Sequence, residues 1–99
     1  MRNEDIESAL FSAELGDAPT LDLHGQSVNV AIDMLSDFIN HEFMEGSPVI
    51  KIIHGRGSGV LRKAVHAWLN SQKTLVAQFR DAQTPDASGG VTVVALHRR

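Results

Sequence analysis

The stretch PVIKIIHGRGSGVL, residues 48 to 61, constrains the fold more than any other part of the chain. Its first half is too short and too rich in β-branched residues for a helix, so it predicts a strand over residues 48–55, buried for most of its length. Three glycines follow within five residues. Apolar residues then recur at i, i+3, i+4, i+7 and i+8 from Leu61 to Leu69. A buried strand, a glycine loop and a helix are therefore expected in direct succession.

The rest of the chain predicts a second strand–helix unit and two further strands. LDLHG, residues 21–25, is a short half-buried strand, and Ser27 is placed to cap a helix whose apolar stripe ends near Gly46. TLVAQFR and VTVVAL predict the third and fourth strands, separated by the loop segment DAQTPDASGG. Residues 4–15 predict an N-terminal helix that Gly16 ends.

The predicted order is thus a helical arm followed by β, α, β, α, β, β. Crossovers between parallel strands are nearly always right-handed, which places both domain helices on the same face of one sheet. We predict a two-layer α/β sandwich with a four-stranded mixed sheet, its second face open, and an N-terminal helical arm. Residues 1–19 would form the arm and linker, and residues 20–99 the domain. Strand alternation directs Leu21 and Leu23 toward the helices and sends Asp22 and His24 to the opposite side or to the end of the strand.

Length and composition limit the classes of protein to consider. A chain of 99 residues makes one domain, and its lack of cysteine excludes disulfides and thiolate sites and fits a reducing, cytoplasmic compartment. No apolar run is long enough for a signal peptide or a membrane span. The net charge of −3 conceals a segregation: ten of the twelve acids lie in residues 1–45, whereas residues 46–80 carry only basic charges. A local field of one sign attracts a polyanion whatever the net charge.

Two polar motifs, LDLHG and IIHGRG, end predicted parallel strands, where ligands of open α/β sheets bind, so we expect them to converge. The nucleotide P-loop spacing G-x-x-x-x-G-K-[ST] is absent, and the dinucleotide pattern G-x-G-x-x-G fails at Val60. What remains is an anion-binding concavity made by glycine-loop amides and a helix N-terminus near Ser58 and Gly59, with Arg56 able to fork onto a phosphate. A tight strand-to-helix turn is the structural alternative.

LDLHG, HGRGSGVLR, the WL pair that closes the second helix, and SGGVTVVAL together resemble the small MutS-related, or Smr, domain over residues 20–97. The resemblance implies a fold similar to the C-terminal domain of a bacterial translation initiation factor, and an endonuclease or nucleic-acid-binding activity. The family's D-L-H and H-G-x-G motifs are linked to cleavage and binding. They fall on Asp22 and His24 and on residues 54–57. With little beyond the domain, the chain resembles the stand-alone bacterial kind.

Phosphodiester cleavage needs a base, an acid and groups that neutralise the pentacoordinate phosphate. We hypothesise that His24 is the general acid or base, and that His54 takes the complementary role. Asp22 either orients His24 or serves as a turn acceptor. The predicted phosphate contacts are Lys51, Gly55, Arg56, Gly57, Ser58, Gly59, Arg62 and Lys63. No metal ligand is assigned, because no dense carboxylate cluster adjoins the loops; we expect metal-independent chemistry or a loosely held Mg²⁺ or Mn²⁺.

Three classes of function stay open. The chain is predicted to be an endonuclease of branched or nicked DNA or of structured RNA, or a nucleic-acid-binding module without chemistry, or a protein-interaction domain. In the third class the acidic arm docks on a basic partner, such as a ribosomal or repair protein, or folds over the site of its own chain. A membrane partner is not expected, and the oligomeric state stays open. His41 and His66 are predicted as surface or boundary residues, and Trp68 and Phe79 as core.

Overall fold

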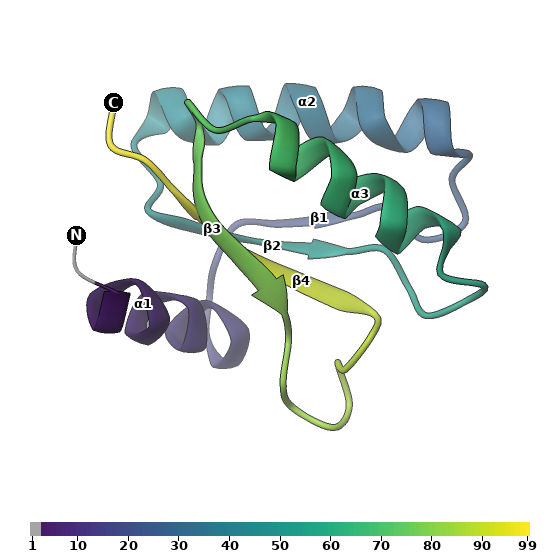
Figure 1. The fold of residues 1–99 in the computed structure, drawn as a ribbon, viewed down its shortest axis with the longest axis horizontal. Helices are drawn as coiled ribbons and strands as arrows, with labels where there is room; N and C mark the ends of the chain where they lie inside the picture. The colour runs from purple at the N-terminus through teal and green to yellow at the C-terminus, as the bar shows by residue number, and fades with distance from the viewer. Residues whose placement is uncertain (1–2) are drawn as a thin grey trace.

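The computed structural model describes residues 3–99. Its elements follow the predicted order, and the α/β fold with a mixed four-stranded sheet and an N-terminal helix is confirmed (Figure 1). The elements are α1 (Asn3–Leu15), β1 (Thr20–Asp22), α2 (Val28–Glu45), β2 (Val49–Ile53), α3 (Val60–Ser71), β3 (Val76–Asp81) and β4 (Val91–Leu96). None of the described helices has the length and apolar character needed to cross a membrane.

The sheet has the strand order β1-β2-β4-β3. β1 pairs parallel to β2, whereas β4 is antiparallel to both of its neighbours, β2 and β3. The first three strands of the chain therefore run in one direction, and β4 is inserted between two of them. As a result the carboxyl ends of β1, β2 and β3 and the beginning of β4 all lie at one edge of the sheet.

Helices α2 and α3 cover one face of the sheet, where the main core lies (Figure 1). Leu23 is fully buried in this core and Leu21 is partly buried against it, as strand alternation predicted. Trp68 and Phe79 are partly buried and pack on the same core. The remaining fully buried side chains of this cluster are Ala31, Leu35, Ile39, Ile50, Ile52, Val65, Leu69 and Val94.

Helix α1 packs on the opposite face of the sheet, which the sequence led us to expect open (Figure 1). Leu10 and Ala13 of α1 are buried against Val93 and Ala95 of β4. The physical reason lies in β4, whose VTVVAL sequence is apolar on both sides, so a bare second face would expose valine and alanine to water. The arm therefore completes the hydrophobic core instead of folding over the glycine loop.

Capping fixes the ends of α2 and α3. The Ser27 side chain accepts a hydrogen bond from the Val30 amide at 3.3 Å, which confirms it as the N-cap of α2. Gly46 ends α2 in the left-handed conformation at φ 80°. α3 begins after Gly59, also left-handed at φ 86°, which has no side chain to cap the helix. Ser58 partly compensates, because its hydroxyl lies 3.4 Å from the Val60 amide.

Candidate active-site cleft

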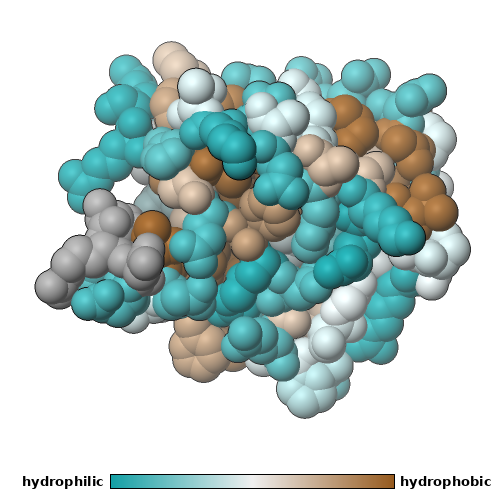
Figure 2. Space-filling view, viewed as in Figure 1, coloured by the Kyte–Doolittle hydropathy of each residue, from teal (hydrophilic) through white to brown (hydrophobic). Residues whose placement is uncertain are grey.

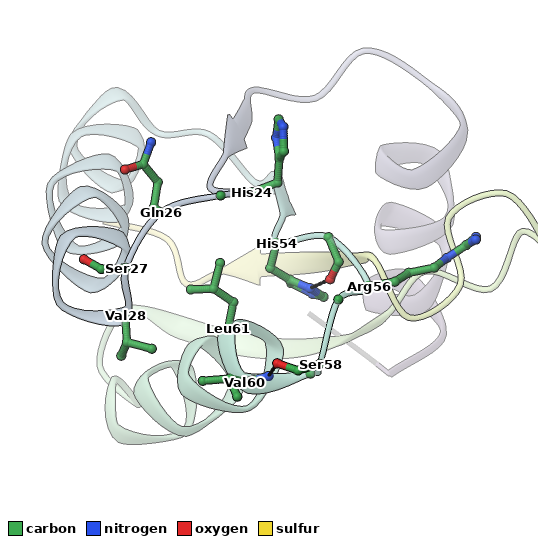
Figure 3. A pocket seen from close by; sticks show the side chains of 13 residues that line it. His24, Gln26, Ser27, Val28, His54, Arg56, Ser58, Val60 and Leu61 are labelled. Atoms are coloured by element: carbon green, nitrogen blue, oxygen red, sulfur yellow. Dashed lines mark hydrogen bonds between the residues drawn. The ribbon is translucent and has the colours of Figure 1, made fainter.

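A cleft of about 590 Å³ lies at the carboxyl ends of β1 and β2, bordered by the N-terminal ends of α2 and α3 (Figure 3). The two polar motifs of the sequence therefore converge as expected. The residues that line the cleft are His24, Gly25, Gln26, Ser27, Val28, His54, Gly55, Arg56, Gly57, Ser58, Gly59, Val60 and Leu61. The side that α2 contributes was missed from the sequence, although Ser27 follows LDLHG as directly as Gly59 follows IIHGRG.

Two helix N-termini at one cleft make it suited to an anion. The first amides of a helix lack partners within the helix, and the aligned peptide dipoles place partial positive charge there. Because α2 and α3 both begin at this cleft, their fields add at its centre. The surface over these helix starts also carries an apolar patch (Figure 2), and Val28 and Val60, which line the cleft, are exposed.

Backbone conformation explains Gly55, and a close contact explains Gly90. Gly55 has a left-handed φ of 79°, which disfavours a side chain, whereas a Cβ there would make only an ordinary contact, 3.4 Å from the Cβ of His24. A Cβ on Gly90 would lie 3.3 Å from Cγ of Arg56. The Gly90 carbonyl accepts hydrogen bonds from the amides of both His54 and Gly55, at 3.1 and 3.0 Å. The start of β4 thus supports the glycine loop directly.

Asp22 and His24 form a hydrogen-bonded pair at the rim of the cleft. One carboxylate oxygen of Asp22 lies 2.7 Å from Nδ1 of His24 and also accepts the His24 amide at 3.1 Å. The side-chain bond is the main cause of a lowered pKa for Asp22, which keeps it ionised. Because a carboxylate only accepts, Nδ1 carries the proton and Nε2 is left for a substrate. The His24 side chain is 72% exposed.

His54 occupies the opposite environment, 3% exposed beneath the glycine loop. Its Nδ1 lies 3.0 Å from the Gly55 carbonyl oxygen, and its Nε2 lies 2.8 Å from the Thr92 hydroxyl. The same hydroxyl lies 2.8 Å from Nε2 of His66. Burial lowers the pKa of both histidines. His66, predicted as a surface or boundary residue, is therefore half-buried and joined to the loop through Thr92.

Asp81, at the end of β3, lies beside these two histidines, with a carboxylate oxygen 3.5 Å from Nε2 of His66. Its pKa is lowered mainly by the guanidinium of Arg62, which donates to both of its oxygens. Donor atoms of His54, His66 and Asp81 lie within 4.8 Å of one another, a set that has the composition of a metal site. In this structure, however, these atoms already have hydrogen-bond partners: the Thr92 hydroxyl for the two histidines and the Arg62 guanidinium for Asp81.

The predicted phosphate contacts separate into two groups. Gly55, Arg56, Gly57, Ser58 and Gly59 line the cleft. The Arg56 guanidinium is directed away from it, toward the β3–β4 loop (Figure 3). There it donates to the carbonyls of Pro85, Asp86 and Ser88 at 3.1, 2.7 and 3.0 Å.

The other three basic residues lie outside the lining of the cleft. Arg62 pairs with Asp81 on the β3 side of α3. Lys63 is exposed in the first turn of α3. Lys51 projects to the other face of the sheet, where its amino group donates to the Glu14 carbonyl of α1 at 3.2 Å. Of the predicted basic contacts, none therefore directs its side chain into the cleft.

Comparison with known families decides the membership of the chain. The Smr domain model matches residues 21–97, which include both polar motifs and all of the cleft. This chain belongs to the Smr domain family. The Endonuclease MutS2 of Aquifex aeolicus is 44% identical to it over 77 residues, which are 78% of this chain and 10% of that protein. The chain spans about a tenth of the length of the curated relatives it matches.

Solved structures of Smr domains agree with this fold. The Smr domain of Thermus thermophilus MutS2 is 32% identical and superimposes with a TM-score of 0.75, covering 80% of this chain and 98% of that one. YdaL, a stand-alone small MutS-related protein from Escherichia coli, has a TM-score of 0.80 at 24% identity and covers 100% of this chain and 79% of that one. The match to YdaL supports the fold alone. The Smr fold therefore positions the cleft described above.

Proposed function

We propose that this Smr domain is a nucleic-acid endonuclease that holds a backbone phosphate in the cleft and uses His24 for proton transfer. The observation that carries the proposal is the Asp22–His24 pair, hydrogen-bonded at 2.7 Å on the rim of a cleft that two helix N-termini border. The relatives named Endonuclease MutS2 support the same class of reaction.

The chemistry assigns a separate task to each group. Asp22 fixes the His24 ring with the proton on Nδ1, so Nε2 takes the proton of the attacking oxygen, which is a water or a ribose 2′-hydroxyl. Amides of the glycine loop and of the first turns of α2 and α3 meet the charge that grows on the phosphate oxygens. Leaving of the product oxygen requires a proton, which the His24 imidazolium or a water supplies. We assign no step to a metal ion.

The substrate class follows from the same cleft. Backbone amides read phosphate and carry no base preference, so the proposal covers branched or nicked DNA and structured RNA alike. Arg56 reaches a phosphate only by leaving its three carbonyl partners in the β3–β4 loop. We therefore give the first phosphate contacts to the amides and treat Arg56 and Lys63 as groups that join when the substrate is bound.

The test is cleavage of an end-labelled structured RNA and of a branched DNA of matched length by the purified chain, with and without a chelator. We expect one of the two to be cut, and we expect His24→Ala to lower the rate by about a hundredfold or more, the usual contribution of a general acid or base. His41→Ala is the matched control, because His41 is exposed at the far end of α2. Binding of both substrates with cleavage of neither contradicts the proposal.

A further inference from the structure

We propose that Thr92 and His66 are positioning residues, which hold His54 in one tautomer and thereby fix the Gly55–Arg56 peptide of the glycine loop. This inference deepens the proposed function and rests on it, because the fixed peptide belongs to the cleft that would hold the phosphate. It assigns His54 to the support of the loop and leaves proton transfer with the substrate to His24.

Burial separates the two histidines of the motifs. His54 is 3% exposed, and each of its ring nitrogens has a hydrogen-bond partner within the protein. A general acid or base must exchange a proton with the substrate, which requires a ring nitrogen within hydrogen-bonding reach of it. His24 meets that requirement and His54 does not. The position of His54 beneath the loop is instead that of a support.

Proton counting gives the direction of each hydrogen bond. A carbonyl oxygen only accepts, so Nδ1 of His54 must carry the proton that it shares with Gly55. In the neutral ring Nε2 is then an acceptor, and the Thr92 hydroxyl donates to it. Thr92 has one proton to give, so its oxygen accepts the Nε2–H of His66. The chain of bonds therefore runs from His66 through Thr92 and His54 to the Gly55 carbonyl.

The surroundings of these hydrogen bonds favour the neutral His54 and His66 rings that this arrangement of protons requires. Burial lowers the pKa of His54, and burial together with the Arg62 charge lowers that of His66. Nε2 of His66 also lies 3.5 Å from a carboxylate oxygen of Asp81, and the negative charge there favours a proton on this nitrogen. The ring of Phe79 lies edge-on to His66 at a centroid distance of 5.0 Å and restricts its rotation.

The fixed tautomer of His54 affects the cleft through the planar Gly55–Arg56 peptide. The Gly55 amide donates to the Gly90 carbonyl, and the Gly55 carbonyl accepts from His54, so the backbone is held on both sides of this residue. Because a trans peptide is planar, fixing the Gly55 oxygen also fixes the direction of the Arg56 N–H. That amide belongs to the loop that lines the cleft. Loss of the Thr92 hydroxyl would free the peptide to rotate.

Thr92→Val and Thr92→Ser test this chain of bonds, because valine removes the hydroxyl at nearly constant shape whereas serine keeps it. The first readout is ¹⁵N NMR of the histidine rings in the full chain, which needs no nucleic acid. We expect wild type and Thr92→Ser to show His54 with the proton on Nδ1 alone, and Thr92→Val to show a mixture of tautomers. In Thr92→Val the amide signals of Arg56 and Gly57 should shift, while those of α1 stay in place.

The second readout is the affinity for a short single-stranded oligonucleotide. We expect Thr92→Val to weaken it by about tenfold, the worth of one well-placed hydrogen bond, and Thr92→Ser to restore it. A wild-type His54 with its proton on Nε2 overturns the inference without any variant, as do unmoved loop amides in Thr92→Val. Failure of the wild type to bind any nucleic acid would instead contradict the proposed function, and the ring tautomer and the loop amides would still decide the positioning role.

Discussion

At the scale of single residues, two histidines at the ends of neighbouring strands have opposite surroundings. His24 is exposed and has one nitrogen held by Asp22, whereas His54 is buried and has both nitrogens held by the protein. Burial disfavours a charged ring, so His54 is suited to bearing fixed hydrogen bonds, while the exposed His24 has a ring nitrogen open to a substrate. In the proposed function, His54 supports the glycine loop and His24 transfers the proton.

The lowered pKa values of His54 and His66 predict how stability depends on pH. In the unfolded chain both rings titrate near 6.5, and in the folded protein both pKa values lie lower. Between these values the unfolded chain binds more protons than the folded protein. The contribution of the two neutral rings to the free energy of unfolding is therefore complete above pH 6.5 and is lost as the pH is lowered through this range. Urea unfolding at about pH 7.5 and about pH 5.5 measures the loss.

A pair of variants isolates the contribution of these two rings. His66→Gln removes one of them, so we expect it to lose less stability between the two pH values than the wild type does. His97→Gln, at the exposed end of the chain, should lose as much as the wild type. Equal losses in all three proteins would show that His66 titrates alike in the folded and unfolded states.

At the scale of elements, the link between α1 and the β3–β4 loop stands out. The Glu14 side chain is 1% exposed and accepts hydrogen bonds from Arg80 and from the amides of Gln83 and Thr84. Burial alone raises the pKa of Glu14, but these bonds outweigh it and lower the pKa, so the group is ionised. Glu14 therefore ties the end of α1 to the loop whose carbonyls hold Arg56.

Removing the charge of Glu14 should cost more than removing that of its neighbour Glu7. Glu14→Gln leaves a buried amide amid three donors, and we expect the free energy of unfolding to fall by about 1–3 kcal/mol. Glu7 also bonds Arg80, but its side chain is half-exposed, so Glu7→Gln should cost no more than about 0.5 kcal/mol. Urea unfolding of both variants at neutral pH measures the difference. Similar losses would mean that Glu14 is not the main tie.

Helix boundaries were predictable from the sequence, because caps are local. Ser27 and Gly46 bound α2 where its apolar stripe begins and ends. A second apolar stripe of helical spacing located α3. The place of α1 was not predictable, because it depends on the second face of β4, whose partner lies about eighty residues away in the chain. The sequence left contact between Asp22 and His24 as one of two alternatives, because strand alternation gives only a shared face and the turn after β1 brings the two side chains together.

At the scale of the whole molecule, folding offsets part of the segregation of charge along the chain. The basic stretch of residues 46–80 meets acids from both ends of the chain: Arg62 pairs with Asp81, and Arg80 with Glu7 and Glu14. Counting charges along the sequence therefore overstated the basic surface. It also left out the backbone amides at the helix starts. The cleft is suited to anions because the topology brings two helix starts to one edge of the sheet.

Chemical rescue of His24→Ala by free imidazole tests the central claim most directly. If His24 transfers a proton to or from the substrate, added imidazole should restore cleavage of the substrate that the wild type cuts, in proportion to its concentration. The His41→Ala protein should gain nothing from imidazole. We expect imidazole to rescue His24→Ala alone. Proton transfer by His24 is contradicted if His24→Ala cleaves at the wild-type rate, or if it binds the substrate and imidazole restores no cleavage.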